Sequence, residues 1–268
     1  MAKMIQPRTP DLGLDADIPR HWFGGNAMAT HLVNGVNLLF PAGERFFVRS
    51  VRRYLDKIAD DPVLCEQVKG FFGQEGRHAH AHERFFEVLS AQGYNVRRYL
   101  DAYERIAYGF LEPRFGPEVR LSVTVALEHF TAILAENALR ERLLEHAHPS
   151  LQKLLFWHAA EEIEHRAVAF DVLRKVNPSY ALRMFGLALA TLALLSFWAS
   201  AVIMLMRQER GMKRGRPLRE VRQMRQHGSI GRRVFLRGIR DYIRRDFHPL
   251  QNDTSPLAEA YLASVGMT

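Results

Sequence analysis

The chain has 268 residues, of which 47% are apolar and one is cysteine, and its formal net charge is +8. This length and apolar content exclude a disordered chain and allow a sizeable core. A single cysteine excludes an internal disulfide framework and a cysteine-rich zinc module. The first thirty residues contain prolines and charges without an apolar run, so we expect no secretory signal and a reducing, cytoplasmic environment.

The residue pattern predicts helices almost throughout and no convincing run of strands, so the predicted fold class is all-α. Residues 1–26 are rich in proline, glycine and aspartate, which predicts an irregular arm. Asp60 and Asp61 before Pro62 indicate a helix start, because capping side chains precede a proline at the first helical position. In the following unit, 27–177, we expect helices over about 40–55, 62–92, 96–109, 117–146 and 149–176.

Residues 178–206 form a separate apolar unit. The run from Met184 to Met206 contains no charge and is long enough to cross a bilayer as a helix, which needs about 20 residues. Arg207 and Arg210 follow at once, which is typical of a membrane segment with a cytoplasmic anchor. The alternative is a helix fully buried in the protein. Because the long domain ahead of this run would otherwise have to cross the bilayer, we expect peripheral association on the cytoplasmic side.

The whole basic excess lies in the last unit, residues 207–268. Residues 1–206 carry 23 basic and 23 acidic side chains, whereas 207–245 carry 14 basic and three acidic ones. Such a block binds nucleic acid or anionic lipid, or is simply solvated. No nucleic-acid motif accompanies it, so we expect an anionic membrane surface as partner and no nucleic acid. Short amphipathic helices are expected near 217–226 and 230–246.

Two Glu-x-x-His motifs, beginning at Glu75 and Glu162, lie in the middle of predicted helices. At three residues apart on a helix, carboxylate and imidazole project from the same face and can hold one metal ion. Two other predicted helices each carry one acid among apolar residues, Glu44 and Glu128. Two antiparallel helix pairs joined by a longer crossover would bring all six side chains to one level of a bundle.

This order of residues is similar to the ferritin-like di-iron carboxylate fold, in which two helices each give a glutamate and two others each give Glu-x-x-His. The stretches FPAGERFF, FFGQEGRHAHAH, ALEHFTA and HAAEEIEHRAVAFD also resemble a bacterial family described as predicted metal-dependent hydrolase. The resemblance implies a ferritin-like four-helix bundle, to which a long apolar helix and a basic C-terminal helical region are added. The metal ligands that it implies are Glu44, Glu75, His78, Glu128, Glu162 and His165.

Neighbouring side chains are candidates for further ligands. His82 and His158 share the helix faces of the two motifs, so each is an extra ligand, an outer hydrogen-bond partner or a core histidine. Glu161 competes with Glu162, and we prefer Glu162 because it repeats the spacing of the first motif. The arginines that we expect to pair with excess carboxylate are Arg77 and Arg166.

These donors suit two divalent metal ions, with iron first and manganese or zinc as alternatives. A di-iron site implies an oxidase or oxygenase, and the apolar helix favours a hydrophobic or lipid-like substrate. One alternative is a hydrolase that uses a metal-activated water, as the family description says. Another is a non-catalytic, membrane-associated metal-binding protein. No nicotinamide or flavin motif is evident, so electrons would come from a separate reductase, and a homodimer is the default assembly.

Overall fold

The computed structural model describes residues 4–14, 17–141, 143–209, 220 and 236–267. Within these residues the chain is all-helical, as predicted, and its strand-like pairing is one antiparallel bridge between Phe23 and Ala147. The α-helices are α1 (Ala27–Asn37), α2 (Phe40–Arg52), α3 (Pro62–Ala91), α4 (Arg97–Glu104), α5 (Pro117–Arg140), α6 (Pro149–His165), α7 (Val168–Val176), α8 (Tyr180–Arg207), α10 (Gly238–Tyr242) and α11 (Ser255–Ser264). A π-helical segment, η2, follows α4 over Arg105–Leu111, and short 3-10 turns cover Leu55–Lys57, Glu112–Arg114 and Pro249–Gln251.

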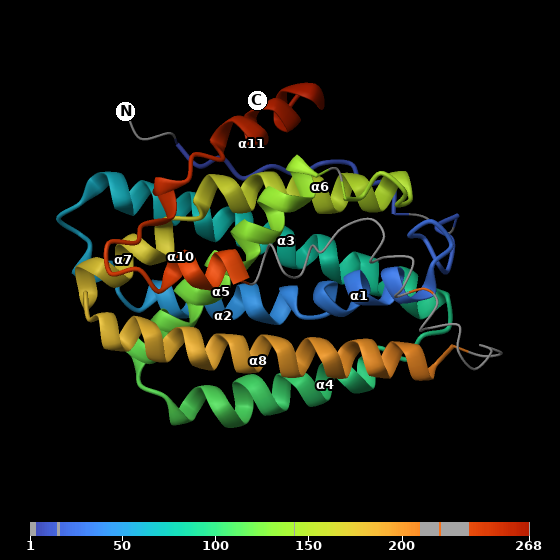
Figure 1. Ribbon diagram of the computed structural model, residues 1–268, viewed down its shortest axis with the longest axis horizontal. Coiled ribbons are helices and arrows are strands. Elements are labelled where there is room, and N and C mark those ends of the chain that lie inside the picture. Colours follow the sequence, from blue (N-terminus) through green and yellow to red (C-terminus); the bar gives the residue numbers. More distant parts are fainter. Residues whose placement is uncertain (1–3, 15–16, 142, 210–219, 221–235, 268) are drawn as a thin grey trace.

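Helix α5 is the central element, in contact with α2, α6, α7 and α8. Because α2 also packs on α3, and α3 on α6, these four long helices, α2, α3, α5 and α6, enclose a common interior. Figure 1 shows α8 running along one side of this group, with α4 beside it, while α11 covers α6 on the opposite side. The expected helix starts at Pro62, where the Asp61 side chain accepts a hydrogen bond from the Leu64 amide at 3.0 Å.

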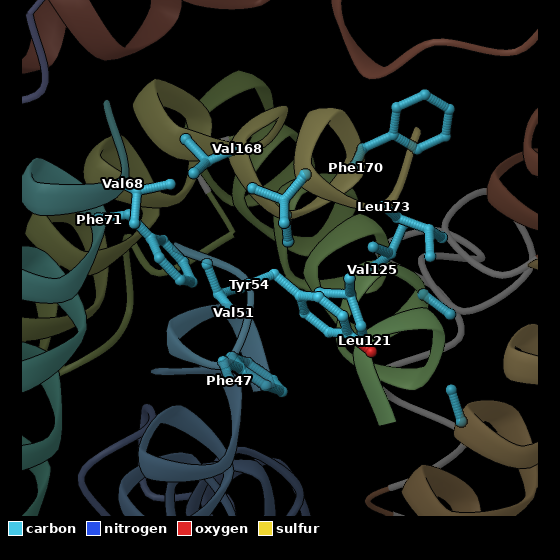
Figure 2. Close-up of a cluster of buried hydrophobic side chains, with 14 of the residues drawn as sticks. Phe47, Val51, Tyr54, Val68, Phe71, Leu121, Val125, Val168, Phe170 and Leu173 are labelled. Atoms are coloured by element: carbon cyan, nitrogen blue, oxygen red, sulfur yellow. The ribbon is translucent and has the colours of Figure 1, made fainter. Parts of the chain in front are cut away.

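Two apolar layers enclose a polar layer at mid-height of the four helices. Figure 2 shows the first layer, where Val51 of α2, Phe71 of α3 and Val125 of α5 are buried together. Phe85 of α3 and Leu154 of α6 belong to the second layer. Burying each such side chain stabilises the fold by roughly 1.5–3 kcal/mol. The two layers therefore fix the heights of the helices relative to one another, and with them the level of the polar residues.

The predicted single helix over 149–176 is wrong, because the chain breaks at Arg166 and Ala167 between α6 and α7. The Arg166 guanidinium donates to the carbonyl of Ile163, which the Ala167 amide would reach in an unbroken helix. The same guanidinium lies 3.3 Å from the Ser255 hydroxyl at the start of α11. A tertiary contact therefore ends α6 directly after its last predicted ligand.

The helix predicted over 117–146 also ends early, at Arg140 rather than near His146. The chain there pairs with the N-terminal arm instead. The Gly24 amide donates to the His146 carbonyl at 2.9 Å, and the His148 amide donates to the Trp22 carbonyl at 2.9 Å. These bonds need an extended backbone, so the helical pattern of the sequence is overridden at this point.

The N-terminal arm packs closely on α3. A Cβ atom placed on Gly70 would lie 2.4 Å from the carbonyl oxygen of Ile5, and one on Gly73 would lie 2.4 Å from Pro7 Cγ. Only glycine leaves room for the arm at these two positions. The arm thereby reaches the outer side of α3 and α6, close to the polar layer.

Helix α8 has one packed face and one exposed apolar face. A Cβ on Gly186 would lie 2.1 Å from the Ser122 hydroxyl, so α8 and α5 are in close contact there. The helix is long and apolar enough to cross a membrane, and 22% of its most apolar window is buried. The basic pieces expected near 217–226 and from 230 lie largely outside the described residues, apart from Glu220 and α10. The exposed large side chains of α8 are Phe185, Leu192, Leu195 and Ile203.

Candidate metal centre

The six predicted ligands lie together in the polar layer, each at most 3% exposed. His165 Nε2 is 3.1 Å from Glu75 Oε1, 3.4 Å from Glu128 Oε2 and 3.6 Å from Glu162 Oε2. Three different helices, α3, α5 and α6, therefore bring polar side chains to His165. The role of these residues as metal ligands stays a prediction. Their positions are Glu44 on α2, Glu75 and His78 on α3, Glu128 on α5, and Glu162 and His165 on α6.

Three overlapping groups of side chains have ligand atoms within 4.8 Å of one another. The groups share Glu75 and His78, so they form one continuous cluster rather than three separate sites. His158 belongs to one of these groups, and its role as an extra ligand stays a prediction. The groups are Glu44 with His78 and His158, Glu75 with His78 and Glu162, and Glu75 with Glu128 and His165.

The cluster contains buried polar atoms that no described residue satisfies. Both carboxylate oxygens of Glu44, Glu75 and Glu128 have no hydrogen-bond partner in the part of the chain that the structure describes. The same holds for Nδ1 of His78 and for Nε2 of His165, whose 3.1 Å approach to Glu75 Oε1 is a close contact without hydrogen-bond geometry. Buried polar groups are normally paired, so such a concentration of orphaned acceptors is unusual. These are the atom types that divalent cations bind.

Each imidazole of the two motifs has one nitrogen fixed from outside the cluster. His78 Nε2 lies 3.0 Å from Glu161 Oε2, and His165 Nδ1 lies 2.8 Å from Gln74 Oε1. When these oxygens accept, the nitrogens facing them carry protons, and Nδ1 of His78 and Nε2 of His165 are the ring nitrogens that face the cluster. Metal-binding histidines in proteins are oriented by the same kind of outer hydrogen bond.

Glu161, the competitor of Glu162, is an outer partner and not a member of the ligand groups. It is held by Arg8 of the arm, whose backbone amide and guanidinium lie 3.1 Å and 3.2 Å from Glu161 Oε1. The same guanidinium makes two hydrogen bonds to Glu164, of 2.7 Å and 3.0 Å. A chain of contacts therefore runs from Arg8 through Glu161 to His78.

His82 lies behind His158 and not in the ligand groups. His82 Nε2 is 2.6 Å from His158 Nδ1, and His158 Nε2 is 2.8 Å from Glu162 Oε1. The ring of Phe40 packs against both imidazoles, with centroid distances of 4.8 Å to His82 and 4.5 Å to His158. His82 therefore orients His158 in the way that Gln74 orients the histidine of the second motif.

Burial and charge crowding perturb the acids of the cluster. Burial, together with the neighbouring carboxylates, raises the pKa of Glu44 and Glu128 well above the ordinary value, and burial also raises the pKa of Glu75. Glu162 is the exception: although burial opposes it, His165 and His158 hold its pKa well below the ordinary value. Without a cation, burial and charge crowding therefore favour the protonated forms of Glu44, Glu75 and Glu128.

The histidines of the cluster also differ in the direction of their pKa shifts. Burial, and then the neighbouring His158, lowers the pKa of His78 and His82 well below the ordinary value. His165 is opposed by burial, but Glu162 and Glu75 raise its pKa well above the ordinary value. Without a metal, the surroundings therefore favour the charged forms of His165 and Glu162 and the neutral forms of His78 and His82. Divalent cations would displace the protons.

A family model described as predicted metal-dependent hydrolase matches residues 6–253. The chain belongs to this family. The matched span includes the arm, the whole polar layer and α8, and the description indicates a metal-dependent enzyme and names hydrolysis as its reaction. No curated protein and no solved structure matches the chain.

In this member of the predicted metal-dependent hydrolase family, several partners of the cluster were not foreseen from the sequence. Arg8 lies in the irregular arm, far from the motifs in sequence, and Thr131 donates to Glu162 from one turn beyond Glu128. Helical spacing from Glu128 could have indicated Thr131, whereas no sequence pattern indicates Arg8. The expectation for Arg77 and Arg166 is wrong: Arg77 donates to Thr9 at 3.0 Å, and Arg166 reaches the C-terminal segment.

A second group of potential metal ligands joins the arm to the end of α8. Nε2 atoms of His21 and His31 lie 3.1 Å and 2.7 Å from Glu209 Oε1, which also accepts a hydrogen bond from Tyr94. Although burial opposes it, hydrogen bonds from Tyr94 and the two histidines lower the pKa of Glu209 to about 2. Arg20 Nε, 3.5 Å away, adds positive charge. Glu209 is thus an ionised and satisfied carboxylate that ties down the end of α8.

Proposed function

We propose that α2, α3, α5 and α6 form a ferritin-like four-helix bundle that holds two divalent metal ions, with iron first and manganese or zinc as alternatives. The observation that carries this proposal is the set of orphaned carboxylate oxygens in the polar layer. Isolated buried charges cost several kcal/mol or more, and bound cations remove that cost. Glutamates from four helices with two Glu-x-x-His motifs are the donor set of di-iron and di-manganese carboxylate proteins.

We further propose that the enzyme is an oxidase or oxygenase. Iron in such a donor set supplies the activation of dioxygen, and the protein contributes ligands, access and dryness. In this chain, Glu161 and Gln74 would hold the two motif imidazoles in one tautomer each. The two apolar layers would exclude bulk water from both ends of the cluster, which strengthens every electrostatic interaction within it.

An apolar cavity beside the cluster supports a hydrophobic or lipid-like substrate. The cavity has a volume of about 440 Å³ and lies between α2, α5, α8 and the π-helical segment η2. Phe40 and Thr131 line it and also contact the polar layer, since Phe40 packs on His158 and Thr131 donates to Glu162. Its size is typical of sites for small molecules, which enclose about 300–1,000 Å³.

Hydrolysis is the second candidate, and the family description favours it. Divalent ions such as zinc lower the pKa of a bound water to about 7 and so provide hydroxide near neutral pH. The same apolar cavity would then hold a hydrophobic ester or amide. A non-catalytic metal-binding protein remains the third alternative, and the cavity next to the cluster argues against it.

The exposed face of α8 supports association with the cytoplasmic side of a membrane. Its exposed apolar side chains would contact acyl chains, and the basic residues that follow would contact anionic headgroups. The same face would alternatively bury itself in a homodimer. As an oxidase or oxygenase, the enzyme would receive its electrons from a separate reductase. Flotation with anionic vesicles, compared with neutral vesicles, tests this part of the proposal.

Activity assays with defined metals separate the two reactions. Protein loaded with Fe(II) is expected to consume dioxygen with a hydrophobic substrate, whereas a hydrolase would release product without dioxygen and with zinc. Glu75→Gln should abolish either activity, and Glu66→Gln, an exposed acid on the same helix, is the matched control. Full activity of metal-free protein or of Glu75→Gln would overturn the proposal.

A further inference from the structure

A basic depression adjoins the apolar cavity. It has a volume of about 360 Å³, and it shares Glu112 and Arg120 with the wall of the cavity. Its lining therefore contains one carboxylate and four arginines, which is a surplus of positive charge. Its four arginines are Arg49, Arg52, Arg53 and Arg120.

Glu112 occupies the point where the depression meets the cavity. Arg49 Nη2 lies 2.9 Å from Glu112 Oε2, and Arg120 Nη1 lies 3.8 Å from Glu112 Oε1. The Glu112 side chain is only 13% exposed, so the guanidinium groups converge at a partly dehydrated place. Guanidinium groups bind carboxylate and phosphate strongly because their planar donors match two oxygens at once.

The apolar cavity continues from this point along one face of α5. Val119, Val123, Leu127, Thr131 and Leu134 line it at helical spacing. From first to last of these residues, the helix rises about 22 Å, so the cavity suits an extended chain better than a compact ring.

The outer wall of the cavity belongs to apolar segments at the surface. The π-helical segment η2 lines the cavity with Tyr108 and exposes Phe110, and α8 lines it with Leu192, which is 66% exposed. π-helical turns are frequent at functional sites. The walls thus combine a charged end with an apolar body that reaches the exposed face of α8.

We propose that the cavity and the basic depression together bind a single-chain anionic amphiphile, with its carboxylate or phosphate at Arg49 and Arg120 and its chain along α5. This deepens, and rests on, the proposed function, because the amphiphile is the substrate of the metal centre. Glu128 lies about 12 Å along α5 from Arg120. Because Phe40 and Thr131 join the cavity wall to the polar layer, the metal centre would lie beside the interior of the bound chain, and the reacting position would be remote from the head group.

Calorimetric titration of the metal-loaded full chain tests whether the site prefers an anionic head group. The probes are dodecanoate, dodecyl phosphate and dodecyltrimethylammonium, which share one chain length. We expect the two anions to bind at least about 10-fold more tightly than the cation, since charge-assisted hydrogen bonds decide the difference. Whichever anion binds more tightly identifies the head group as a fatty-acid carboxylate or a phosphate.

Variants with opposite expected effects on dodecanoate affinity test the roles of the arginines and of Glu112. Arg49→Gln combined with Arg120→Gln should weaken dodecanoate binding about 10- to 100-fold. Glu112→Gln should strengthen it, because the competing carboxylate is removed, whereas a purely structural Glu112 would give no gain. Val123→Trp should weaken all three probes by filling the cavity. Arg98→Gln, an exposed arginine on α4, is the control and should change nothing.

Equal binding of anions and cation, or no effect of the arginine and Val123 variants, would overturn this inference. Glu75→Gln separates it from the proposed function, because this variant should lose metal and turnover while it still binds dodecanoate. Turnover that needs metal, without any preference for anions, would refute the amphiphile and leave the metal enzyme standing. Tight dodecanoate binding in a chain that takes up no metal would refute the proposed function instead.

Discussion

The contact chain from Arg8 to His78 predicts that an arginine in the N-terminal arm controls metal affinity. Arg8→Gln removes two hydrogen bonds to Glu164 and one to Glu161, and charged hydrogen bonds contribute about 1.5–3 kcal/mol each. The Arg8 side chain is 13% exposed, so water compensates for part of the lost hydrogen-bond energy. We expect the free energy of unfolding to fall by about 2–4 kcal/mol, because two nearly buried carboxylates lose their cation.

The effect on the metal site is the sharper test of this reasoning. Burial already raises the pKa of Glu161, and Arg8 opposes that rise, so its removal favours the protonated acid and weakens the bond that orients His78. We expect metal affinity to fall about 10- to 100-fold, measured by competition with a chromophoric chelator. Arg77→Gln also removes a contact between α3 and the arm, at Thr9, and should change stability by less than about 0.5 kcal/mol. Equal metal affinity in both variants would refute the role of Arg8.

Three further predictions concern protons and packing. Because burial raises the pKa of three carboxyl groups in the cluster, metal binding should release protons and tighten as pH rises, and calorimetry in buffers of different ionisation enthalpy would detect this. The folded-state pKa of Glu209 is about 2, so the stability that its carboxylate contributes is present above the ordinary pKa near 4.5 and is lost as pH falls toward 2. The difference in unfolding free energy between wild type and Glu209→Gln, measured in urea, should therefore close between these two pH values. Gly186→Ala should cost about 1–3 kcal/mol because its Cβ meets Ser122, whereas Gly76→Ala, in open space on α3, should stabilise by about 0.5–1 kcal/mol; thermal melts showing the same sign for both would contradict the packing described.

The sequence predicted the cluster well because helical spacing controls it. Glu75 and His78 had to share a face once α3 formed, and the same holds for Glu162 and His165. Capping signals at Asp61 and Pro62 placed the start of α3 correctly. Local pattern thus predicted the helices and the faces that meet in the polar layer, and the resemblance to a family predicted which of those faces would meet.

Long-range contacts explain what the sequence did not predict. The break after His165 comes from a guanidinium that takes a backbone carbonyl, and nothing in the helical pattern of α6 indicates it. Arg8 reaches Glu161 across 153 residues, so no periodicity connects them. The group around Glu209 draws on the arm, α1 and the end of α8, and its members carry no common spacing.

Metal content per chain shows whether the polar layer is a metal site. We would measure it on protein purified without chelator and again after loading with Fe(II), together with the optical spectrum before and after exposure to air. We expect about two ions per chain, a clear rise in melting temperature on loading, and loss of both in Glu75→Gln but not in Glu66→Gln. A chain that binds no divalent metal, and whose melting temperature is the same with and without metal, would refute the proposed metal site.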